Sequence, residues 1–327
     1  MPSVAIIGAG LAGLTAAHYL KDHAQVTVFE KARGVSGRMS TRRAEPYFFD
    51  HGAQYFTARL ARFRAFLQPL IAAGIIAPWH ARFVEIEHNQ IIRRRQWDDE
   101  YPHYVGVPGM NAVAKSLAAE LDIRVATRVG GITRSAGSWL LQDEEGQRLG
   151  EYDWVISAIP AEQAAVLLPD SLDFHAQIQQ TKASACFSLM LGFAEPLTLD
   201  FDAAMIRQHE LSWISVNNAK PKRAPAFSLL VHSDNQWADQ HVDDDREQVR
   251  QFLMTRLSDL LDQDVSAAAH QVMHAWRYAN IGKQAGDDYF LDAEQHLGVC
   301  GDWLVQGRVE AAFQSASGLA EAIQQTL

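Results

Sequence analysis

The sequence predicts an α/β protein in which a Rossmann-like nucleotide-binding domain carries an inserted mixed-sheet α+β domain. Three observations predict this fold class. An apolar strand, a glycine-rich turn, a helix and a second strand follow one another over residues 4–30. An apolar strand, a Gly-Asp turn and a helix recur near the C-terminus, over residues 297–326. Between them, residues 184–193 and 226–233 alternate between polar and apolar side chains, as strands of a second sheet do.

Each part of the N-terminal segment has a physical role in binding a dinucleotide. Gly8 permits a tight turn, Gly10 lets the backbone approach a pyrophosphate, and Gly13 lets the helix pack near the strand. The helix N-terminus offers free N–H groups and the positive end of its dipole to phosphates. Glu30, which closes the strand over 26–29, can accept hydrogen bonds from an adenosine ribose. A purely structural βαβ unit is the alternative.

Hydrophobic periodicity and turn residues predict the other elements. In chain order, the N-terminal half contains a helix over 55–73 ending at Gly74, a hairpin over 82–94 turning at His88-Asn89, a helix over 107–121, a strand over 123–125, a hairpin over 132–149 turning at 143–146, and a buried strand over 154–160 stopped by Pro160. The C-terminal half adds an amphipathic helix over 243–261, a strand over 272–278 and a closing helix over 309–326.

The organisation of the chain predicts two interwoven domains. The sequence has no internal repeat, low-complexity tract or Pro/Gly/Ser-rich linker, and its 327 residues are enough for two cores. We expect the nucleotide-binding domain to comprise residues 1–50, 105–162 and 290–327. The substrate domain then comprises residues 51–104 and 163–289.

The composition is typical of a soluble globular protein and disfavours several kinds of partner. Hydrophobic residues make up 48% of the chain and charged residues 21%. A formal net charge of -10 disfavours nucleic acid and anionic membranes as partners. The two cysteines, Cys186 and Cys300, form no CxxC or metal-like cluster, so we expect no metal and a cytoplasmic location. No apolar stretch reaches the roughly 18 residues of a membrane span.

Two further glycine-containing clusters follow the first motif. In the run Arg33–Met39, glycines allow a loop to press against a long cofactor, and the guanidinium of Arg38 suits a pyrophosphate. The alternative is a solvated basic turn, but this loop leaves the second strand at the end that carries the phosphate turn. The run Asp50–Phe56 brings a glycine, a polar side chain and an aromatic ring to the entrance of the second domain.

The fourth cluster combines the runs Val299–Trp303 and Gly307–Ala312. A helix that starts here would direct N–H donors at a redox ring, and such donors stabilise the negative charge that a reduced flavin carries near N1 and C2=O. Asp302 can hydrogen-bond a ribityl or pyrophosphate group. The four clusters together indicate FAD, because this cofactor is long enough to need contacts from both ends of the chain.

In this order the motifs resemble those of the FAD-containing amine oxidase superfamily and, within it, of the bacterial renalases. The matching stretches are GxGxxG with Glu30, the RxxxGRM run, Gly52–Arg59, Trp213 with Asn217, Lys220 and Pro221, Gln236-Trp237, His274–Ala279, Cys300–Trp303 and the GRVEAA run. Two positions depart from the family pattern. Ser36 and Ala311 each stand where a glycine is common, and the methyl of Ala311 can alter how closely the backbone meets the flavin ring.

The resemblance implies a two-domain fold like that of p-hydroxybenzoate hydroxylase and a noncovalently bound FAD. It also implies a reaction, the oxidation of the 2- and 6-dihydro isomers of NAD(P)H to NAD(P)+ by hydride transfer to flavin N5. O2 then reoxidises the flavin and gives H2O2. The implied partners are a nicotinamide dinucleotide substrate and O2.

The motifs and the resemblance together predict the site residues. The predicted FAD contacts are Gly8, Gly10, Leu11, Ala12, Gly13, Glu30, Lys31, Arg38, Met39, Gly52, Ala53, Gln54, Val129, Asp302, Val309, Glu310 and Ala311. The predicted catalytic residues are Tyr55, His232, Trp276 and Tyr278, because a dihydronicotinamide needs walls that stack it over the flavin. The alternative is core packing for the aromatic residues, and for His232 a core histidine satisfied by a backbone carbonyl.

Two other functions stay open on the sequence. A flavin amine oxidase acting on a small amine is the rival enzyme. Many such enzymes carry a lysine near flavin N5 in a substrate-domain strand, whereas the corresponding run 185–191 contains none. The second alternative is a non-catalytic flavin-binding sensor module, against which the large inserted domain argues. Covalent flavin attachment is disfavoured, because Cys300 lies in a predicted buried strand and Cys186 is expected in the core.

Overall fold

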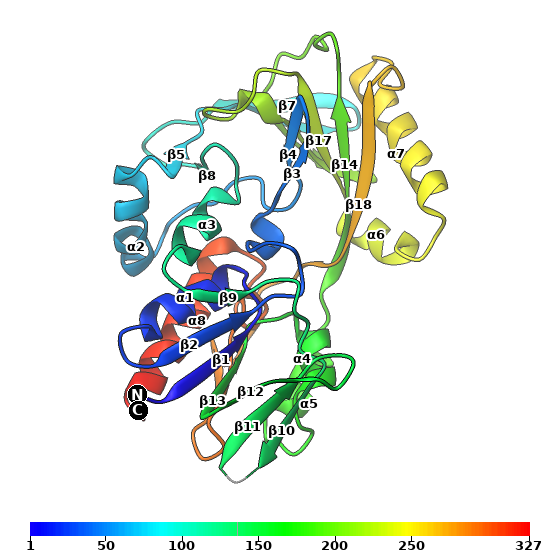
Figure 1. The fold of residues 1–327 in the computed structure, drawn as a ribbon. Coiled ribbons are helices and arrows are strands. Elements are labelled where there is room, and N and C mark those ends of the chain that lie inside the picture. The colour runs from blue at the N-terminus through cyan, green and yellow to red at the C-terminus, as the bar shows by residue number, and fades with distance from the viewer. Residues whose placement is uncertain (136) are drawn as a thin grey trace.

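Two sheets organise the protein, one in each half of the molecule (Figure 1). The structure, a computed structural model, describes residues 1–135 and 137–327. A mostly parallel sheet lies in the lower half of the view, and a larger mixed sheet lies in the upper half. Across these described ranges, no helix is long and apolar enough to cross a membrane.

The lower sheet has six strands in the order β19-β20-β13-β1-β2-β9. The strands are β1 (Ser3–Ile7), β2 (Gln25–Phe29), β9 (Asp122–Arg124), β13 (Trp154–Ser157), β19 (Phe290–Asp292) and β20 (Leu297–Val299). All neighbours are parallel except β19, which runs antiparallel to β20. Every residue of β1 after Ser3 is buried, as expected for a parallel strand covered on both faces.

Helices cover one face of this sheet and a small antiparallel sheet covers the other. The helices α1 (Leu11–Leu20), α3 (Ala112–Ala118) and α8 (Val309–Gln324) share a core with Val4 and Ile6. The opposite core, around Ala5 and Ile7, is formed by β10 (Gly131–Ser135), β11 (Ser138–Gln142), β12 (Arg148–Tyr152), α4 (Ala161–Leu167) and α5 (His175–Gln180). The first and last helices of the chain therefore stabilise the same side of the sheet.

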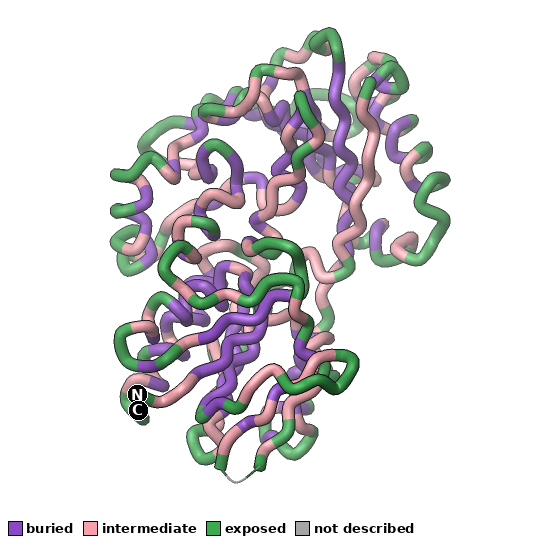
Figure 2. The backbone as a smooth tube through the Cα atoms, viewed as in Figure 1, coloured by how far each residue is buried: buried purple, intermediate pink, exposed green. Residues whose placement is uncertain are grey.

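The upper sheet has seven strands in the order β18-β14-β17-β16-β15-β6-β7. The strands are β6 (Arg82–Glu87), β7 (Gln90–Gln96), β14 (Ser184–Gly192), β15 (Ala203–Arg207), β16 (Leu211–Val216), β17 (Ser228–Ser233) and β18 (His270–Asn280). The outer face packs on α6 (Asn235–His241) and α7 (Arg246–Leu261). The inner face packs on the hairpin of β3 (Thr41–Ala44) and β4 (Tyr47–Asp50), and α2 (Ala61–Ala72), β5 (Ile76–Pro78) and β8 (Tyr104–Gly106) lie beside it. Figure 2 shows long buried stretches in both sheets and exposed outer turns on α7.

The predicted fold class is confirmed, and three local predictions are wrong. The helix expected over 107–121 spans only Ala112–Ala118. The helix expected over 55–73 begins only at Ala61, because Phe56 pairs instead with Tyr104 in an isolated β-bridge. The hairpin expected over 132–149 is a three-stranded meander, since the chain also reverses between β10 and β11, where Gly137 has φ +93. Residue 136 of that segment lies outside the described residues.

Candidate cofactor and substrate site

The glycine turn after β1 has the shape that a dinucleotide needs. Gly8 has φ +106, and a Cβ there would come within 2.9 Å of the carbonyl oxygen of Ala158. A Cβ on Gly13 would overlap the carbonyl oxygen of Gly8, so the helix approaches the turn as closely as predicted. Helix α1 has no side-chain cap and no acidic residue in its first turn, which leaves its N–H groups to a phosphate. This cradle fits the pyrophosphate of FAD.

The end of β2 carries the features expected for the adenosine half of the cofactor. The carboxylate of Glu30 accepts the N–H groups of Ala9 at 2.9 Å and Ala32 at 2.8 Å, and it keeps lone pairs for a ribose. Lys31 and Arg128 line a cleft of about 560 Å³ beside it. Among the other predicted FAD contacts, the buried apolar side chains are those of Leu11, Ala12, Met39, Val129 and Ala311.

The first three sequence clusters meet backbone to backbone. The N–H of Ser36 donates to the carbonyl oxygen of Ala9 at 3.0 Å. The N–H of Ala53 donates to the carbonyl oxygen of Arg38 at 2.8 Å. A Cβ on Gly52 would overlap that same oxygen, so this position requires glycine for steric reasons. The glycine turn, the loop before β3 and the loop after β4 therefore form one continuous surface.

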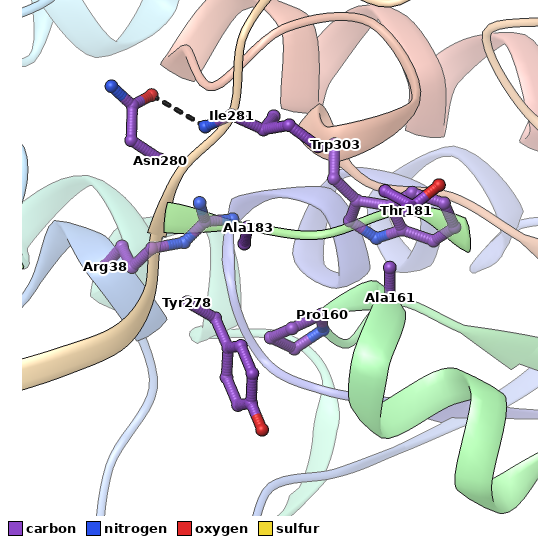
Figure 3. A pocket seen from close by; sticks show the side chains of 9 residues that line it. All are labelled: Arg38, Pro160, Ala161, Thr181, Ala183, Tyr278, Asn280, Ile281 and Trp303. Carbon is purple, nitrogen blue, oxygen red and sulfur yellow. Dashed lines mark hydrogen bonds between the residues drawn. The ribbon is translucent and has the colours of Figure 1, made fainter. Parts of the chain in front are cut away.

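Arg38 joins this surface to the fourth cluster. Its guanidinium forms an ion pair with Asp302 and donates to the carbonyl oxygen of Ala279 at 3.2 Å. Figure 3 shows Arg38, Tyr278 and Trp303 around one small pocket. The structure therefore brings together three predicted site residues, Arg38, Asp302 and Tyr278, from distant parts of the chain.

Glu310 makes a contact that the sequence did not predict. Its Oε1 accepts the N–H groups of Arg59 at 2.6 Å and Leu60 at 2.7 Å, immediately before α2. Both N–H groups precede Ala61, the first residue of α2, so Glu310 fixes the path of the chain into α2 from the opposite end of the sequence. The side chain of Glu310 is therefore occupied. The predicted flavin contacts at Val309 and Ala311 would be made by backbone N–H groups of α8, which no side chain caps.

Four rings on the inner face of the upper sheet form a packed histidine group of His51, His232, His274 and Trp276. Ser188 on β14 lies directly opposite both His232 on β17 and His274 on β18. The ring of His51 stacks on Trp276 with centroids 5.2 Å apart and meets His274 edge-on at 5.3 Å. Burial lowers the pKa of His51 and of His232 to about 4, so both imidazoles are neutral at pH 7.

A second set of rings, the aromatic group, comprises Tyr55, Trp97, His103 and Trp213. The Tyr55 ring centroid lies 4.9 Å from that of Trp97, 5.0 Å from His103 and 5.5 Å from Trp213. Burial raises the pKa of the Tyr55 hydroxyl, and the charge of Arg308 opposes that shift. The four predicted catalytic residues therefore lie in three places, with Tyr55 here, His232 and Trp276 in the histidine group, and Tyr278 beside Arg38.

Sequence reasoning missed a buried set of charges, the ion cluster of Asp50, Lys220 and Arg223. The side chains of Asp50 and Lys220 are 0% exposed. The Oδ2 atom of Asp50 accepts from Nζ of Lys220 at 3.3 Å and from Nη2 of Arg223 at 2.7 Å. Burial alone would raise the pKa of Asp50, but the two cations hold it at about 2, whereas burial lowers the pKa of Lys220 to about 8. One carboxylate faces two cations, so the cluster keeps net positive charge at pH 7.

Weak signals for the ion cluster were present in the sequence. Asp50 opens one of the four motifs, and Lys220 lies in a stretch that resembles the renalases. Nothing singled out Arg223, which reaches Asp50 only because the chain turns after the short helix η2 (Asn217–Ala219). The pairing depends on contacts between residues about 170 positions apart, which no local pattern encodes.

Comparison with known proteins assigns the family. A model of flavin containing amine oxidoreductases matches residues 78–324, and a model of NAD(P)-binding Rossmann-like domains matches residues 6–70. The chain belongs to the flavin containing amine oxidoreductases. FAD is therefore its cofactor, in agreement with the fit of the glycine turn and Glu30 described above.

Individual relatives are more distant. "Probable polyamine oxidase 4" of Arabidopsis thaliana is 29% identical over 118 residues, which cover 35% of this chain and 23% of that protein. The chain thus matches about a quarter of the length of this relative. Among solved structures, "Putative protoporphyrinogen oxidase" from Exiguobacterium sp. 255-15 superposes with a TM-score of 0.80 at 12% identity, covering 100% of this chain and 99% of that one. Putrescine oxidase bound to putrescine gives 0.70 at 12% identity, covering 98% of each chain. These structural likenesses show the fold.

Proposed function

We propose that the chain is a renalase-like oxidase that converts the 2- and 6-dihydro isomers of NAD(P)H to NAD(P)+. The observation that carries this proposal is the net positive charge of the ion cluster, in a protein whose formal net charge is -10. A site with this local charge favours an anionic dinucleotide and repels the ammonium groups of a polyamine.

Other cations reinforce this preference. Burial, and after it the charges of Arg42 and Arg246, lower the pKa of His274. The positive charge of Arg308 likewise acts to lower the pKa of Tyr55, and so favours negative charge at its hydroxyl. Both ring groups are therefore close to positive side chains, and such surroundings suit the pyrophosphate of a dinucleotide substrate.

The proposed reaction needs little acid–base catalysis from the side chains of this protein. FAD, when bound, supplies a hydride acceptor at N5 and passes the electrons to O2, which becomes H2O2. A dihydropyridine regains aromaticity as its hydride leaves, so no side chain needs to remove a proton from carbon. The protein's contribution is to stack the planar donor and exclude water, for which Trp276, Tyr278 and Tyr55 offer flat faces. Neutral His51 and His232 add polarity without adding a further positive charge.

A flavin amine oxidase acting on a small amine is the second candidate. Similarity to "Probable polyamine oxidase 4" favours it, and the aromatic group offers a set of rings that could surround an amine. Strand β14, however, contains no lysine, and the buried Lys220 contributes positive charge from a different segment.

Anaerobic titration of the holoprotein separates these functions. We expect 6-dihydro-NAD, added in stoichiometric amounts, to bleach the flavin absorbance near ~450 nm, with H2O2 formed once O2 is readmitted. Putrescine and spermine serve as the amine arm, and ordinary 4-dihydro NADH serves as the isomer control. Bleaching by amines alone would replace the proposal with the amine oxidase, and no bleaching by any donor would favour a flavin-binding sensor.

A further inference from the structure

Lys220 is fully buried, and its ammonium group is completely engaged. Nζ donates to Oε1 of Gln54 at 3.1 Å, to Oδ2 of Asp50 at 3.3 Å and to Oδ1 of Asn217 at 3.3 Å. It also lies 5.4 Å from the centroid of the Trp79 ring. A lysine has three donors, so none is left for water or substrate. Any influence of Lys220 on the cofactor through hydrogen bonds must therefore pass through a neighbour.

Gln54 is the neighbour that leads toward the cofactor. Its Oε1 accepts from Lys220 and from Oγ of Ser215 at 2.8 Å. Its Nε2 donates to the backbone carbonyl oxygens of Asp50 and Gly52, the latter at 2.9 Å. Both lone pairs and both N–H groups of the Gln54 amide are used. Because Lys220 can only donate, the oxygen of the amide must face Lys220 and its nitrogen must face the backbone carbonyl groups.

The backbone held by Gln54 is the part that contacts the cofactor loops. Gly52 packs directly on the carbonyl oxygen of Arg38, and Ala53 donates to that oxygen. Arg38 in turn pairs with Asp302, and the same loop bonds to the glycine turn through Ser36. A continuous set of contacts therefore runs from the ammonium of Lys220 to the dinucleotide turn.

We infer that Lys220 is a positioning residue for FAD, which orients Gln54 and thereby holds the backbone of residues 52–53 against Arg38. Lys220 touches neither cofactor nor substrate in this role. Its charge matters because a hydrogen bond from an ammonium is stronger than one from a neutral donor, and because a buried cation without its carboxylate and amide acceptors would be unstable. The inference rests on the FAD site alone and holds whichever substrate the enzyme oxidises.

A double-mutant cycle tests this path. The variants are Lys220→Met, Gln54→Met and the double variant, with Lys222→Met as a matched control on an exposed lysine two residues away. The readouts are the dissociation constant of FAD, measured by the fluorescence released from diluted holoprotein, and the visible spectrum of the bound flavin. Each single variant is expected to weaken FAD binding about tenfold, the size of one lost charged hydrogen bond, and the double variant to weaken it by no more than that. Lys222→Met is expected to bind FAD normally.

The conservative variant separates positioning from simple stability. Lys220→Arg keeps a cationic donor and is expected to restore the flavin spectrum and most of the affinity. If Lys220→Met does not fold, Lys220→Gln takes its place in the cycle, because it keeps a neutral donor at the same position. Effects that multiply in the double variant would overturn the inference. So would a variant that lowers the thermal midpoint while leaving FAD affinity and the flavin spectrum unchanged.

Discussion

The glycine turn and the inner face of the upper sheet are organised in different ways. The shape of the turn depends on backbone contacts. A Cβ on Gly8 would meet the carbonyl oxygen of Ala158, and a Cβ on Gly13 would meet that of Gly8. The shape of the inner face depends on side chains, because the register of β14, β17 and β18 brings the rings of the histidine group together. At the turn, an added Cβ would overlap fixed backbone atoms, whereas on the inner face the removal of one ring leaves a cavity without displacing the strands.

The largest expected effect is at the turn. Gly13→Ala places a methyl group on the carbonyl oxygen of Gly8, and the helix must move away from the strand. We expect a loss of FAD affinity of more than about a hundredfold, because the phosphate cradle opens. The matched control is Gly131→Ala in β10, where a Cβ meets open space. The measurement is the FAD content of each purified protein, and a yellow Gly13→Ala protein with normal affinity would refute the backbone argument.

A smaller effect is expected at the end of β2. Glu30→Ala removes the acceptor shared by the N–H groups of Ala9 and Ala32 and the predicted ribose contact. We expect FAD affinity to fall about tenfold to a hundredfold, since one or two hydrogen bonds to a charged group are lost. Dialysis of the variant, beside the exposed-site control Glu45→Ala, gives the retained FAD. Equal retention in both would remove Glu30 from the binding site.

The side-chain wall is tested by Trp276→Ala. The variant removes the ring that stacks on His51 and the donor to the carbonyl oxygen of that residue. We expect flavin reduction by the dihydro substrate to slow about tenfold while FAD content stays normal, because stacking positions the donor but not the cofactor. Stopped-flow reduction of Trp276→Ala and the graded variant Trp276→Phe provides the measurement. Unchanged rates would leave Trp276 as a packing residue.

The smallest expected effect is a change in acid stability. The pKa values of His51 and His232 are lowered to about 4 in the folded protein, so the unfolded chain binds more protons between pH 6.5 and pH 4. Stability should therefore fall as pH drops through that window. His232→Gln, which cannot titrate, should show a shallower fall of the thermal midpoint with pH. Parallel curves for variant and parent would show that His232 is not buried as a neutral base.

The sequence could predict what local patterns encode. The fold class and FAD followed from glycines, apolar runs and an acid at fixed spacing, and the amine oxidase superfamily followed from the resemblance of the motifs; these three are confirmed, whereas the renalase-like activity stays a prediction. The hairpin turn at His88-Asn89 is also confirmed, with φ values of +50 and +59. The start of α2 was not predictable, because it depends on the pairing of Phe56 with Tyr104 and on the contact of Glu310 with Leu60, both distant in sequence. Arg223 was missed for the same reason. The domain bounds, the individual site residues and the noncovalent state of FAD stay predictions.

The contacts that residues 297–324 make with the first half of the chain, including those of Glu310 with Arg59 and Leu60, have a consequence for the order of events during synthesis. When the first half of the nascent chain has left the ribosome, α1 still lacks its partner α8, and β13 lacks its neighbour β20. Asp302, the partner of Arg38, is also missing at that stage. The nucleotide-binding half therefore closes only after residues 297–324 emerge, although its signature lies at the start of the chain. A complete FAD site therefore forms only after residues 297–324 have been synthesised.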